Sequence, residues 1–426
     1  MNRTTCALVT VVMLSACAVE PDPMDRIAED YVMLVLALGQ HDGDYVDAYY
    51  GQEEWRTAAE QAAMPLEEIR SAGEALLEEL DALVATDEEI GRRRFLATQT
   101  GALVARTRML LGETFSFDEE SRLLYDAVAP TNTDEHFAGV LERIATLLPG
   151  TGTISERYND FRAQFVIPPA LVDTVFQTAI QECRRRTREF ITLPDGESFV
   201  VEYVTDKSWS GYNWYQGGYQ SLIQVNIDFD IYIDRAIDLA CHEGYPGHHT
   251  YNVLLEHELV ERNGWVEHAI YPLFSPKSLI AEGSANYGID MAFPGEERVR
   301  YETAVLFPLA GLDPGQAEQY YEIDALLGEM SYAGNEAARR YLDGIVDGEE
   351  AAQWLVRYAM FAPDRAAQRV RFVDQYRSYV INYNLGRDLV GDWVEREAGG
   401  DAAARWDVFR QLLSSPRLPG DLIGGS

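Results

Sequence analysis

The chain has 426 residues, with 70 acidic and 35 basic side chains, so its formal charge is −35 at pH 7. A charge this negative argues against binding to nucleic acid or to an anionic membrane through a basic surface. Hydrophobic residues make up 47% of the chain, which is ample for a buried core. The composition therefore predicts a globular protein, in one large domain or in two to three ordinary ones.

The N-terminus has the layout of a secretory signal. A short basic start is followed by an apolar stretch over residues 7–14 that is too short to cross a bilayer. Residues 14–17, Leu-Ser-Ala-Cys, resemble a bacterial lipobox, which predicts a signal peptide over residues 1–16, a lipid on Cys17 and a tether over residues 17–24. Ala18 then favours the periplasmic face of the outer membrane. The alternative is an ordinary signal peptide.

Most of the remaining chain is predicted to be helical, because apolar residues recur at three-and-four spacing. The clearest such pattern runs from Leu171 to Cys183, after Pro168-Pro169. Similar patterns predict helices over residues 25–40, 67–85, 90–111, 136–148, 315–331, 334–346, 350–360 and 364–383. Alternating or β-branched residues predict strands over 199–204 and 222–228, and so a mainly α fold with a small β-sheet.

A turn at residues 193–196 divides the prediction into an N-terminal helical region over residues 25–195 and a C-terminal region over residues 196–426 that carries the chemistry. Two cysteines remain beyond Cys17. Cys183 and Cys241 could pair in an oxidising compartment, or they could be two buried free thiols.

Three of the seven histidines lie within residues 242–249, HEGYPGHH. This stretch begins like the zinc-peptidase motif H-E-x-x-H, but Pro246 stands where the second histidine belongs. A helix is predicted to lead into His242, because apolar residues recur from Ile233 to Ala240. If that helix continued unbroken, the backbone of His249 would lie about 10 Å along the axis from His242, too far for the two to share one zinc.

Pro246 predicts an interruption, because proline lacks an N–H, clashes with the preceding turn and pushes Tyr245 out of helical angles. Gly247 can then take the unusual backbone angles needed to turn the chain back. If two residues are looped out, the histidine that returns beside His242 is His248; if three, it is His249. We favour His248 as the second metal ligand, in part because of a family resemblance given below, and keep His249 as the alternative.

A carboxylate usually completes a catalytic zinc site that has two histidines. Ser275-Pro276 predicts the start of a helix, and Glu282 lies two turns into it, among small residues that would let this helix approach the histidine helix. Asn286 lies one turn further on the same face and could support a ligand by a hydrogen bond. Other carboxylates within range are Glu256, Glu258 and Glu267.

Glu243 directly follows the first ligand and is predicted to act as general base, taking a proton from a metal-bound water and passing it to the departing amine. A further hydrogen-bond donor is needed where negative charge develops in the transition state. Candidates are Tyr379, Tyr383 and Arg387, of which we select Tyr383.

Residues 242–249 and Glu282-Gly283 give the chain a resemblance to a broad bacterial family of largely uncharacterised, often lipid-anchored proteins with the signature H-E-x-x-P-G-H-H. That family is similar to the helical zinc peptidases of the carboxypeptidase Taq, oligopeptidase and angiotensin-converting-enzyme group. Gly247-His248 also resembles the end of the H-E-x-x-G-H motif of the dipeptidyl peptidase III family. Where many members have E-G-W-A, this chain has Glu282-Gly283-Ser284-Ala285. The resemblance implies a large helical fold with a deep cleft, one Zn²⁺ ion and hydrolysis of peptide bonds.

Together these observations predict a lipid-anchored zinc metallopeptidase of the cell envelope, with a peptide as substrate and no nucleic-acid partner. The strand over 222–228 is expected to hold the substrate backbone by strand addition, and residues 209–219 to form a flap, a pocket wall or core packing. One alternative is an amidase that acts on peptidoglycan peptides or small amides. Another is a catalytically inactive, metal-containing lipoprotein that binds peptides or a partner.

Overall fold

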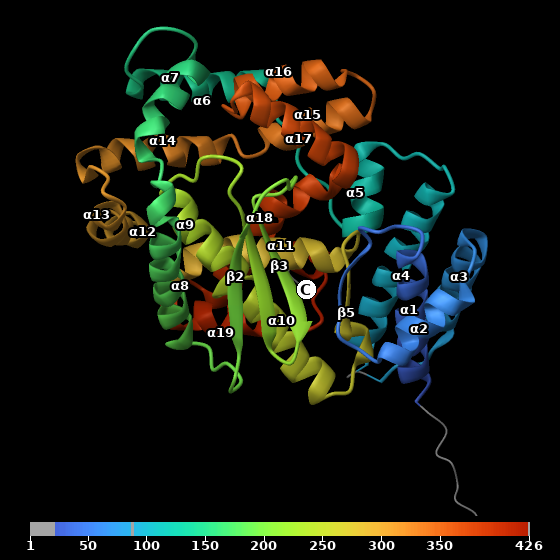
Figure 1. Ribbon diagram of the computed structural model, residues 1–426. Helices are drawn as coiled ribbons and strands as arrows, with labels where there is room; N and C mark the ends of the chain where they lie inside the picture. Colours follow the sequence, from blue (N-terminus) through green and yellow to red (C-terminus); the bar gives the residue numbers. More distant parts are fainter. Residues whose placement is uncertain (1–21, 87–88, 425–426) are drawn as a thin grey trace, which may run out of the picture.

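A computed structural model describes residues 22–86 and 89–424 of the chain, which form a mainly α-helical fold, as predicted, with two small β-sheets where one was expected (Figure 1). The predicted signal peptide and Cys17 lie outside the described residues. Within them, no helix is both long enough and apolar enough to cross a bilayer.

The first half of the described chain contains α1 (Pro23–Gly39), β1 (Val46–Tyr49), α2 (Glu53–Ala62), α3 (Leu66–Ala82), α4 (Ile90–Leu110), α5 (Phe117–Tyr125), α6 (Asp134–Leu147), α7 (Ile154–Arg162), α8 (Val172–Arg188), β2 (Ser198–Val204) and β3 (Gly211–Gly217). The middle contains β4 (Gln220–Asn226), α9 (Asp234–Leu239), the π-helix η3 (Ala240–Gly244), α10 (His248–Leu255), β5 (Ile270–Pro272) and α11 (Pro276–Ala292). The last part contains α12 (Glu297–Tyr301), α13 (Phe307–Ala310), α14 (Ala317–Glu329), α15 (Ala333–Leu342), α16 (Gly348–Tyr358), α17 (Pro363–Tyr376), α18 (Ile381–Ala398), α19 (Ala402–Leu413) and α20 (Pro419–Ile423). Short π- or 3₁₀-helical turns link several of these: η1 (Ala163–Phe165), η2 (Pro169–Leu171), η4 (Glu256–Glu261), η5 (Val266–Ala269), η6 (Glu302–Leu306), η7 (Pro314–Gln316) and η8 (Arg377–Val380).

The larger sheet has the strand order β2-β4-β3, with β2 parallel and β3 antiparallel to β4. The predicted strand over 222–228 therefore corresponds to the central strand β4, whose backbone is paired on both sides. The expectation that a substrate backbone pairs with this strand is therefore wrong, because β4 has no free edge. The edge strand β3, which the sequence pattern did not identify as a strand, lies beside it and packs on α10.

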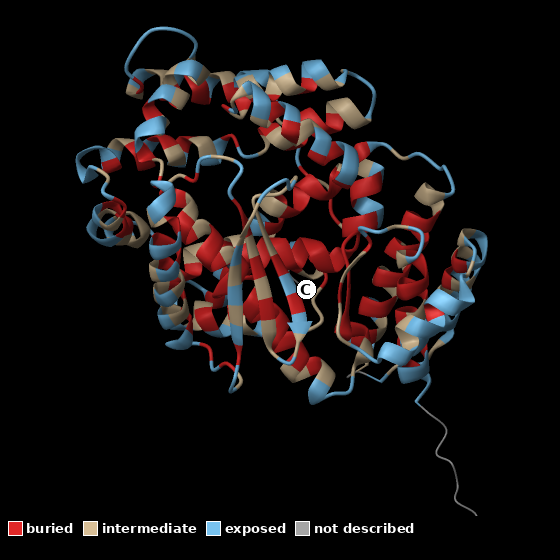
Figure 2. Ribbon diagram, in the orientation of Figure 1, coloured by how far each residue is buried: buried red, intermediate tan, exposed pale blue. Residues whose placement is uncertain are grey.

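α11 is the helix around which the rest of the fold is arranged. Only Asn286, Ile289 and Asp290 along it are not buried, and Figure 2 shows it as a continuous buried helix behind the sheet. It crosses α18 with the two backbones in contact, since a Cβ on Gly283 would overlap the backbone of Gly386. The small residues predicted around Glu282 thus serve mainly to bring α18 close, while Gly288 faces Pro246 beside η3.

Two large buried apolar cores and a small third cluster of Ala337, Leu355 and Ala366 lie among the described residues. One joins α1, α3, α4 and α5 to residues 270–279 and 372–385, and the other joins α6 to α10 with the sheet and residues 280–422. The two predicted regions, with their boundary near residue 195, stay a prediction. Cys183 on α8 and Cys241 on η3 form a disulfide, which is the first of the two alternatives for these cysteines.

The single helix predicted over residues 364–383 is wrong. It breaks at Arg377, whose φ of 53° is in the left-handed region, and α18 begins at Ile381. The break is held by Glu120 on α5, whose carboxylate accepts hydrogen bonds from Arg377 Nε at 2.7 Å and from the backbone N–H of Ser378 at 3.1 Å.

Candidate metal centre

The chain changes direction between His242 and His248. The helix α9 continues into η3 as far as Gly244, Tyr245 is extended with a ψ of 118°, and α10 begins at His248. Gly247 has the unusual backbone angles that were expected, with a φ of −77° and a ψ of −137° that is neither helical nor extended. A Cβ at this position would also overlap the carbonyl oxygen of His242. The interruption therefore brings two turns of backbone into direct contact.

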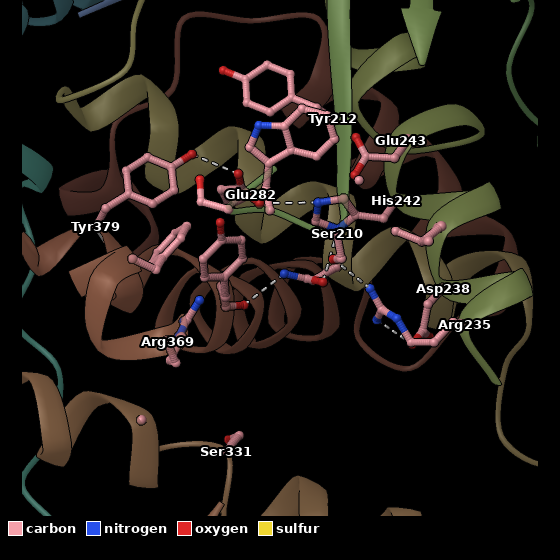
Figure 3. A pocket seen from close by; sticks show the side chains of 18 of the residues that line it. Ser210, Tyr212, Arg235, Asp238, His242, Glu243, Glu282, Ser331, Arg369 and Tyr379 are labelled. Carbon is pink, nitrogen blue, oxygen red and sulfur yellow. Dashed lines mark hydrogen bonds and ion pairs between the residues drawn. The ribbon is translucent and has the colours of Figure 1, made fainter. Parts of the chain in front are cut away.

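This turn places His248 beside His242, as the two-residue loop predicted. The Nε2 atoms of the two imidazoles are 3.1 Å apart. Oε2 of Glu282 on α11 lies 3.2 Å from Nε2 of His242 and 3.7 Å from Nε2 of His248 (Figure 3). Two imidazole nitrogens and a carboxylate oxygen, from three elements, thus converge on one point.

The donor atoms suit a zinc ion. Nitrogen and oxygen ligands at roughly 2.0–2.1 Å from a tetrahedral zinc lie about 3.3 Å from one another, close to the separations of 3.1, 3.2 and 3.7 Å found here. Oε2 of Glu282 is also buried and lacks a hydrogen-bond donor among the described residues, which is costly unless a cation fills that place. Burial opposes ionisation of Glu282, but the facing His248 and His242 lower its pKa overall, so it is a carboxylate.

Two neighbouring side chains hold His242 and Glu282 in place. Oδ1 of Asn286 lies 3.1 Å from Nδ1 of His242, as expected from its position one turn after Glu282. Tyr379 donates its hydroxyl proton to Oε1 of Glu282 at 2.7 Å, which leaves Oε2 facing the histidines (Figure 3). Hydrogen bonds of this kind orient metal ligands in known sites.

Glu243 lies at the wall of a pocket of about 650 Å³ that also contains the three converging residues. Asn213 of β3 fixes the backbone of Glu243 by donating to its carbonyl oxygen at 2.7 Å. Gly211 passes so close to the carboxylate that a Cβ there would lie 2.8 Å from Oε1 of Glu243. Burial raises the pKa of the Glu243 carboxyl, which favours proton uptake.

His249, the alternative ligand, points away from this cluster. Its Nδ1 lies 2.8 Å from the hydroxyl oxygen of Ser221 on β4, and its Nε2 lies 3.1 Å from Oε2 of Glu197. The same Glu197 oxygen accepts the hydroxyl proton of Tyr245 at 2.5 Å. Because Tyr245 and His249 stand on either side of Pro246-Gly247, this buried network fixes both ends of the turn.

The other carboxylates that had been alternatives as third ligand are not in the cluster. Glu267 forms a buried ion pair with Arg92 at 2.6 Å. Glu256 accepts hydrogen bonds from Tyr215 and from the backbone of Gly218 and Tyr219. Glu258 pairs with Arg262.

The structure places only some of the predicted transition-state donors in the pocket. Tyr383 lines the pocket, and its ring centre lies 5.7 Å from that of Tyr379. Arg387 lies outside the pocket lining and pairs with Asp290 at 2.8 Å. Sequence reasoning missed another pocket pair, Tyr212 of β3 and Asp47 of β1, in which the tyrosine hydroxyl donates to the carboxylate. These two residues are 165 positions apart, so no local pattern could have revealed the contact.

Comparison with known proteins adds a likeness of fold. No protein-family model matches the sequence, and no curated protein matches it. Among solved structures, one similar protein is a candidate lipoprotein of Colwellia psychrerythraea, with a TM-score of 0.50 and 16% identity over 95% of this chain and 75% of that one.

Two further structures are less similar. An M32 carboxypeptidase of Deinococcus radiodurans R1 has a TM-score of 0.48 and 12% identity, over 94% of this chain and 93% of that one. A candidate lipoprotein of unknown function from Shewanella oneidensis has a TM-score of 0.41 and 15% identity, over 85% of this chain and 76% of that one. At these identities the likeness concerns the fold alone.

Proposed function

We propose that this protein is a zinc-dependent hydrolase that cleaves peptide bonds. The observation that carries the proposal is the convergence of His242 Nε2, His248 Nε2 and a Glu282 carboxylate oxygen in a pocket that also contains Glu243. Two histidines, one carboxylate and an adjacent buried glutamate are the residues that a zinc peptidase needs.

Zinc bound by His242, His248 and Glu282 would supply a Lewis acid that polarises the scissile carbonyl and lowers the pKa of water to about 7. Glu243 takes the proton from the attacking water on its carboxylate and delivers it to the departing amine, so that one water and one peptide bond become an acid and an amine. The buried setting of Glu243 raises its pKa and so favours the uptake of that proton.

The substrate backbone is proposed to lie along β3 in place of the expected strand. β3 is an edge strand, and Gly211, Tyr212 and Asn213 line the pocket beside Glu243. An extended peptide can pair with such an edge without any demand on its side chains. Tyr383, which faces the same pocket, is proposed as the donor to the oxygen on which negative charge develops.

Metal analysis tests the ligand assignment. We expect purified protein to bind about one zinc per chain, His248→Ala to lose it, and His249→Ala to keep it because its ring faces Ser221 and Glu197. Zinc retained by His248→Ala and lost by His249→Ala would reverse the assignment. A wild-type protein that binds no zinc from a buffered solution would end the proposal.

A substrate panel tests the reaction. Peptides, murein fragments and small acyl amides are incubated with wild type and with Glu243→Gln, which keeps the side chain's size but removes its basicity. We expect wild type to cleave peptides and Glu243→Gln to be at least about 10²-fold slower with its zinc content unchanged. Hydrolysis confined to murein fragments or acyl amides would point to an amidase, and no hydrolysis by either protein to a binding role.

We also propose that a lipid on Cys17 anchors the protein at the periplasmic face of the outer membrane. This proposal rests on the lipobox-like residues 14–17, with support from the fold shared with a candidate lipoprotein. Full-length protein expressed in a bacterial host should enter the outer-membrane fraction, and Cys17→Ser should shift it away from the membrane. Identical fractionation of the two proteins would refute the anchor.

A further inference from the structure

Asp47 of β1 places a carboxylate in the wall of the pocket that contains the metal centre. The pairing of β1 with β5 shifts its register between Val46 and Ala48, so Asp47 is the extra residue of a β-bulge. Bulges redirect side chains and are common beside active sites. Oδ1 of Asp47 accepts the hydroxyl proton of Tyr212, whereas Oδ2 has no hydrogen-bond donor among the residues that the structure describes. This second oxygen can therefore accept a hydrogen bond from a bound molecule.

Within the described part of the chain, no basic side chain forms an ion pair with Asp47. The charges of His248 and Lys277 act on it from a distance. Lys277 donates instead to two backbone carbonyl oxygens, and His248 faces the other metal ligands. Burial raises the pKa of Asp47 to about 6, although the Tyr212 hydroxyl and His248 act in the opposite direction. A carboxylate in this position is costly unless a cation approaches it.

Three aromatic rings form a wall beside this carboxylate. The ring of Tyr212 stacks on that of Trp214, with 4.4 Å between the ring centres, and its centre lies 5.4 Å from that of Trp209. Trp209 and Tyr212 line the pocket, and Trp214 is exposed. The ammonium group of Lys207 lies 5.8 Å from the ring centre of Trp209, so one ring of the wall already faces a cation. Aromatic faces attract ammonium and guanidinium groups, and a carboxylate beside them adds to that attraction.

Two arginines of the pocket lie away from this wall. Figure 3 shows Tyr212 on one side of Glu282, and both Arg235 and Arg369 on the other. A cation beside Asp47 is therefore kept apart from these guanidinium groups. The formal charge of −35 on the whole chain also favours the approach of positively charged molecules.

The proposed pairing of a substrate with β3 would direct one of its side chains along this wall. Residues directly opposite each other in paired strands place their side chains on the same face, with Cβ atoms about 4.5–5.5 Å apart. The substrate residue opposite Tyr212 therefore points its side chain along the Tyr212 ring, toward the hydroxyl and Asp47. Lysine and arginine side chains are similar in length to tyrosine, so their charged ends reach the level of the Asp47 carboxylate.

We propose that Asp47, together with the rings of Tyr212 and Trp209, forms a subsite that binds a lysine or arginine side chain of the substrate. The protein then cleaves peptides at a fixed position relative to a basic residue. This deepens the proposed peptidase function and rests on it for the cleavage step. The rings contact the methylene groups of the basic side chain, and Oδ2 of Asp47 accepts a hydrogen bond from its charged end.

Binding tests the subsite independently of catalysis. Titration calorimetry is performed on zinc-loaded Glu243→Gln protein with alanine pentapeptides that are acetylated and amidated, so that their ends carry no charge. The central residue is lysine or norleucine, which has nearly the same shape without the charge. We expect the lysine peptide to bind at least about tenfold more tightly, and the two dissociation constants to become equal in Asp47→Asn.

Two further variants separate the role of Asp47 from a general effect on the fold. Tyr212→Phe keeps the ring and loses the hydrogen bond to Asp47, so it should retain part of the preference for lysine. Asp44→Asn, at an exposed aspartate three residues before Asp47, is the matched control and should retain all of it. Zinc content and thermal unfolding of each variant show that the fold and the metal centre are intact.

Hydrolysis then locates the subsite relative to the cleaved bond. Wild type should cut peptides with a single lysine at one fixed distance from that lysine, wherever it stands in the peptide. Asp47→Asn should raise KM for these peptides about tenfold or more.

Three results would decide against the subsite or against the reaction. Equal binding of the lysine and norleucine peptides, or a preference that survives Asp47→Asn, would overturn the proposal. If a free N-terminal amine on the norleucine peptide reproduced the gain and Asp47→Asn removed it, Asp47 would bind the N-terminus, and the proposal would also be overturned. Lysine-selective binding without hydrolysis of any peptide would uphold the subsite and refute only the peptidase function.

Discussion

The side-chain amide of Asn286 determines which ring nitrogen of His242 carries the proton. Its nitrogen donates to the carbonyl oxygen of Tyr383 at 3.0 Å, so its oxygen must face Nδ1 of His242, 3.1 Å away. Because that oxygen can only accept, Nδ1 carries the ring proton, and the lone pair of Nε2 is directed toward His248 and Glu282. A neutral amide thus fulfils the role that a carboxylate often has in such sites.

We expect Asn286→Ala to weaken zinc binding about 10–100-fold, because the imidazole of His242 then loses the acceptor that selects its tautomer. Asn286→Asp should retain most of the affinity, since a carboxylate accepts the same hydrogen bond. Zinc dissociation constants from competition with a chelating dye measure both effects. Equal affinities for wild type and Asn286→Ala would show that Asn286 does not orient the ligand.

We expect Tyr379 to affect zinc binding and Tyr383 to affect the rate of hydrolysis. Tyr379 donates to Glu282, so Tyr379→Phe should weaken zinc binding several-fold or more. Tyr383→Phe removes a hydroxyl that forms no hydrogen bond with His242, His248 or Glu282 in the structure, so zinc affinity should stay and kcat should fall about 10²-fold if this hydroxyl is the transition-state donor. Zinc affinity together with kcat and KM for the two variants separates these roles, and a loss of zinc in Tyr383→Phe would contradict the division.

Local sequence patterns predicted the residues of the candidate site better than its surroundings. The apolar stripe from Ile233 to Ala240 and the proline after His242 were enough to expect an interrupted helix that returns either His248 or His249 to His242, and a family resemblance added to the preference for His248. Glu282 followed from a helix start at Ser275-Pro276. The interruption and the helix start needed only helix geometry and the residues within one element, whereas the choice of His248 and of Glu282 also drew on known zinc peptidases.

The features of the fold that could not be predicted are set by contacts between segments far apart in the sequence. The break at Arg377 is stabilised by hydrogen bonds to Glu120, and no residue between 364 and 383 indicates it in the sequence. β3 has mixed aromatic and glycine residues with little alternation, so only its pairing with β4 defines it as a strand. Gly283 could be recognised as a site of close approach, but the sequence could not show that its neighbour is Gly386 on α18.

His248 and His249 are expected to affect different properties, although they are adjacent. His249 is fully buried between Ser221 and Glu197, so His249→Gln should lower the free energy of unfolding by about 1–3 kcal/mol while zinc still binds. His248→Ala should abolish zinc binding with a smaller effect on the stability of the metal-free protein. Denaturant unfolding after chelation, with the exposed His136→Gln as control, measures the stability of each variant.

We expect a methyl group at Gly283, where α11 crosses α18, to destabilise the protein. Gly283→Ala places a Cβ against the backbone of Gly386, so the helices must move apart, and we expect a loss of several kcal/mol. Gly139→Ala on α6 is the matched control, since a Cβ there has nothing within 4 Å, and alanine should stabilise the helix by up to about 1 kcal/mol. If thermal unfolding of Gly283→Ala equals that of wild type, the close crossing is refuted.

Lys277 gives the stability of the fold a dependence on pH. Its ammonium group is buried near the start of α11, where it donates to the carbonyl oxygens of Ile270 and His268 at 3.2 and 3.4 Å. Burial lowers its pKa to about 7, although Asp47 and Glu267 act in the opposite direction. In the unfolded chain a lysine holds its proton up to a pH of about 10.4. Between these two values the unfolded chain therefore binds more protons, and the free energy of unfolding must increase with pH.

We expect wild type to gain about 1 kcal/mol per pH unit relative to Lys277→Met between pH 7 and 10, with little difference in slope below pH 6. Lys277→Met loses two hydrogen bonds, so its absolute stability at one pH is less informative than its slope. Lys207 is the chain's other lysine and is exposed, which makes Lys207→Met the matched control with the wild-type slope. Urea unfolding across this range, with chelator present throughout, measures the slopes; parallel curves for wild type and Lys277→Met would mean that Lys277 remains charged in the folded protein.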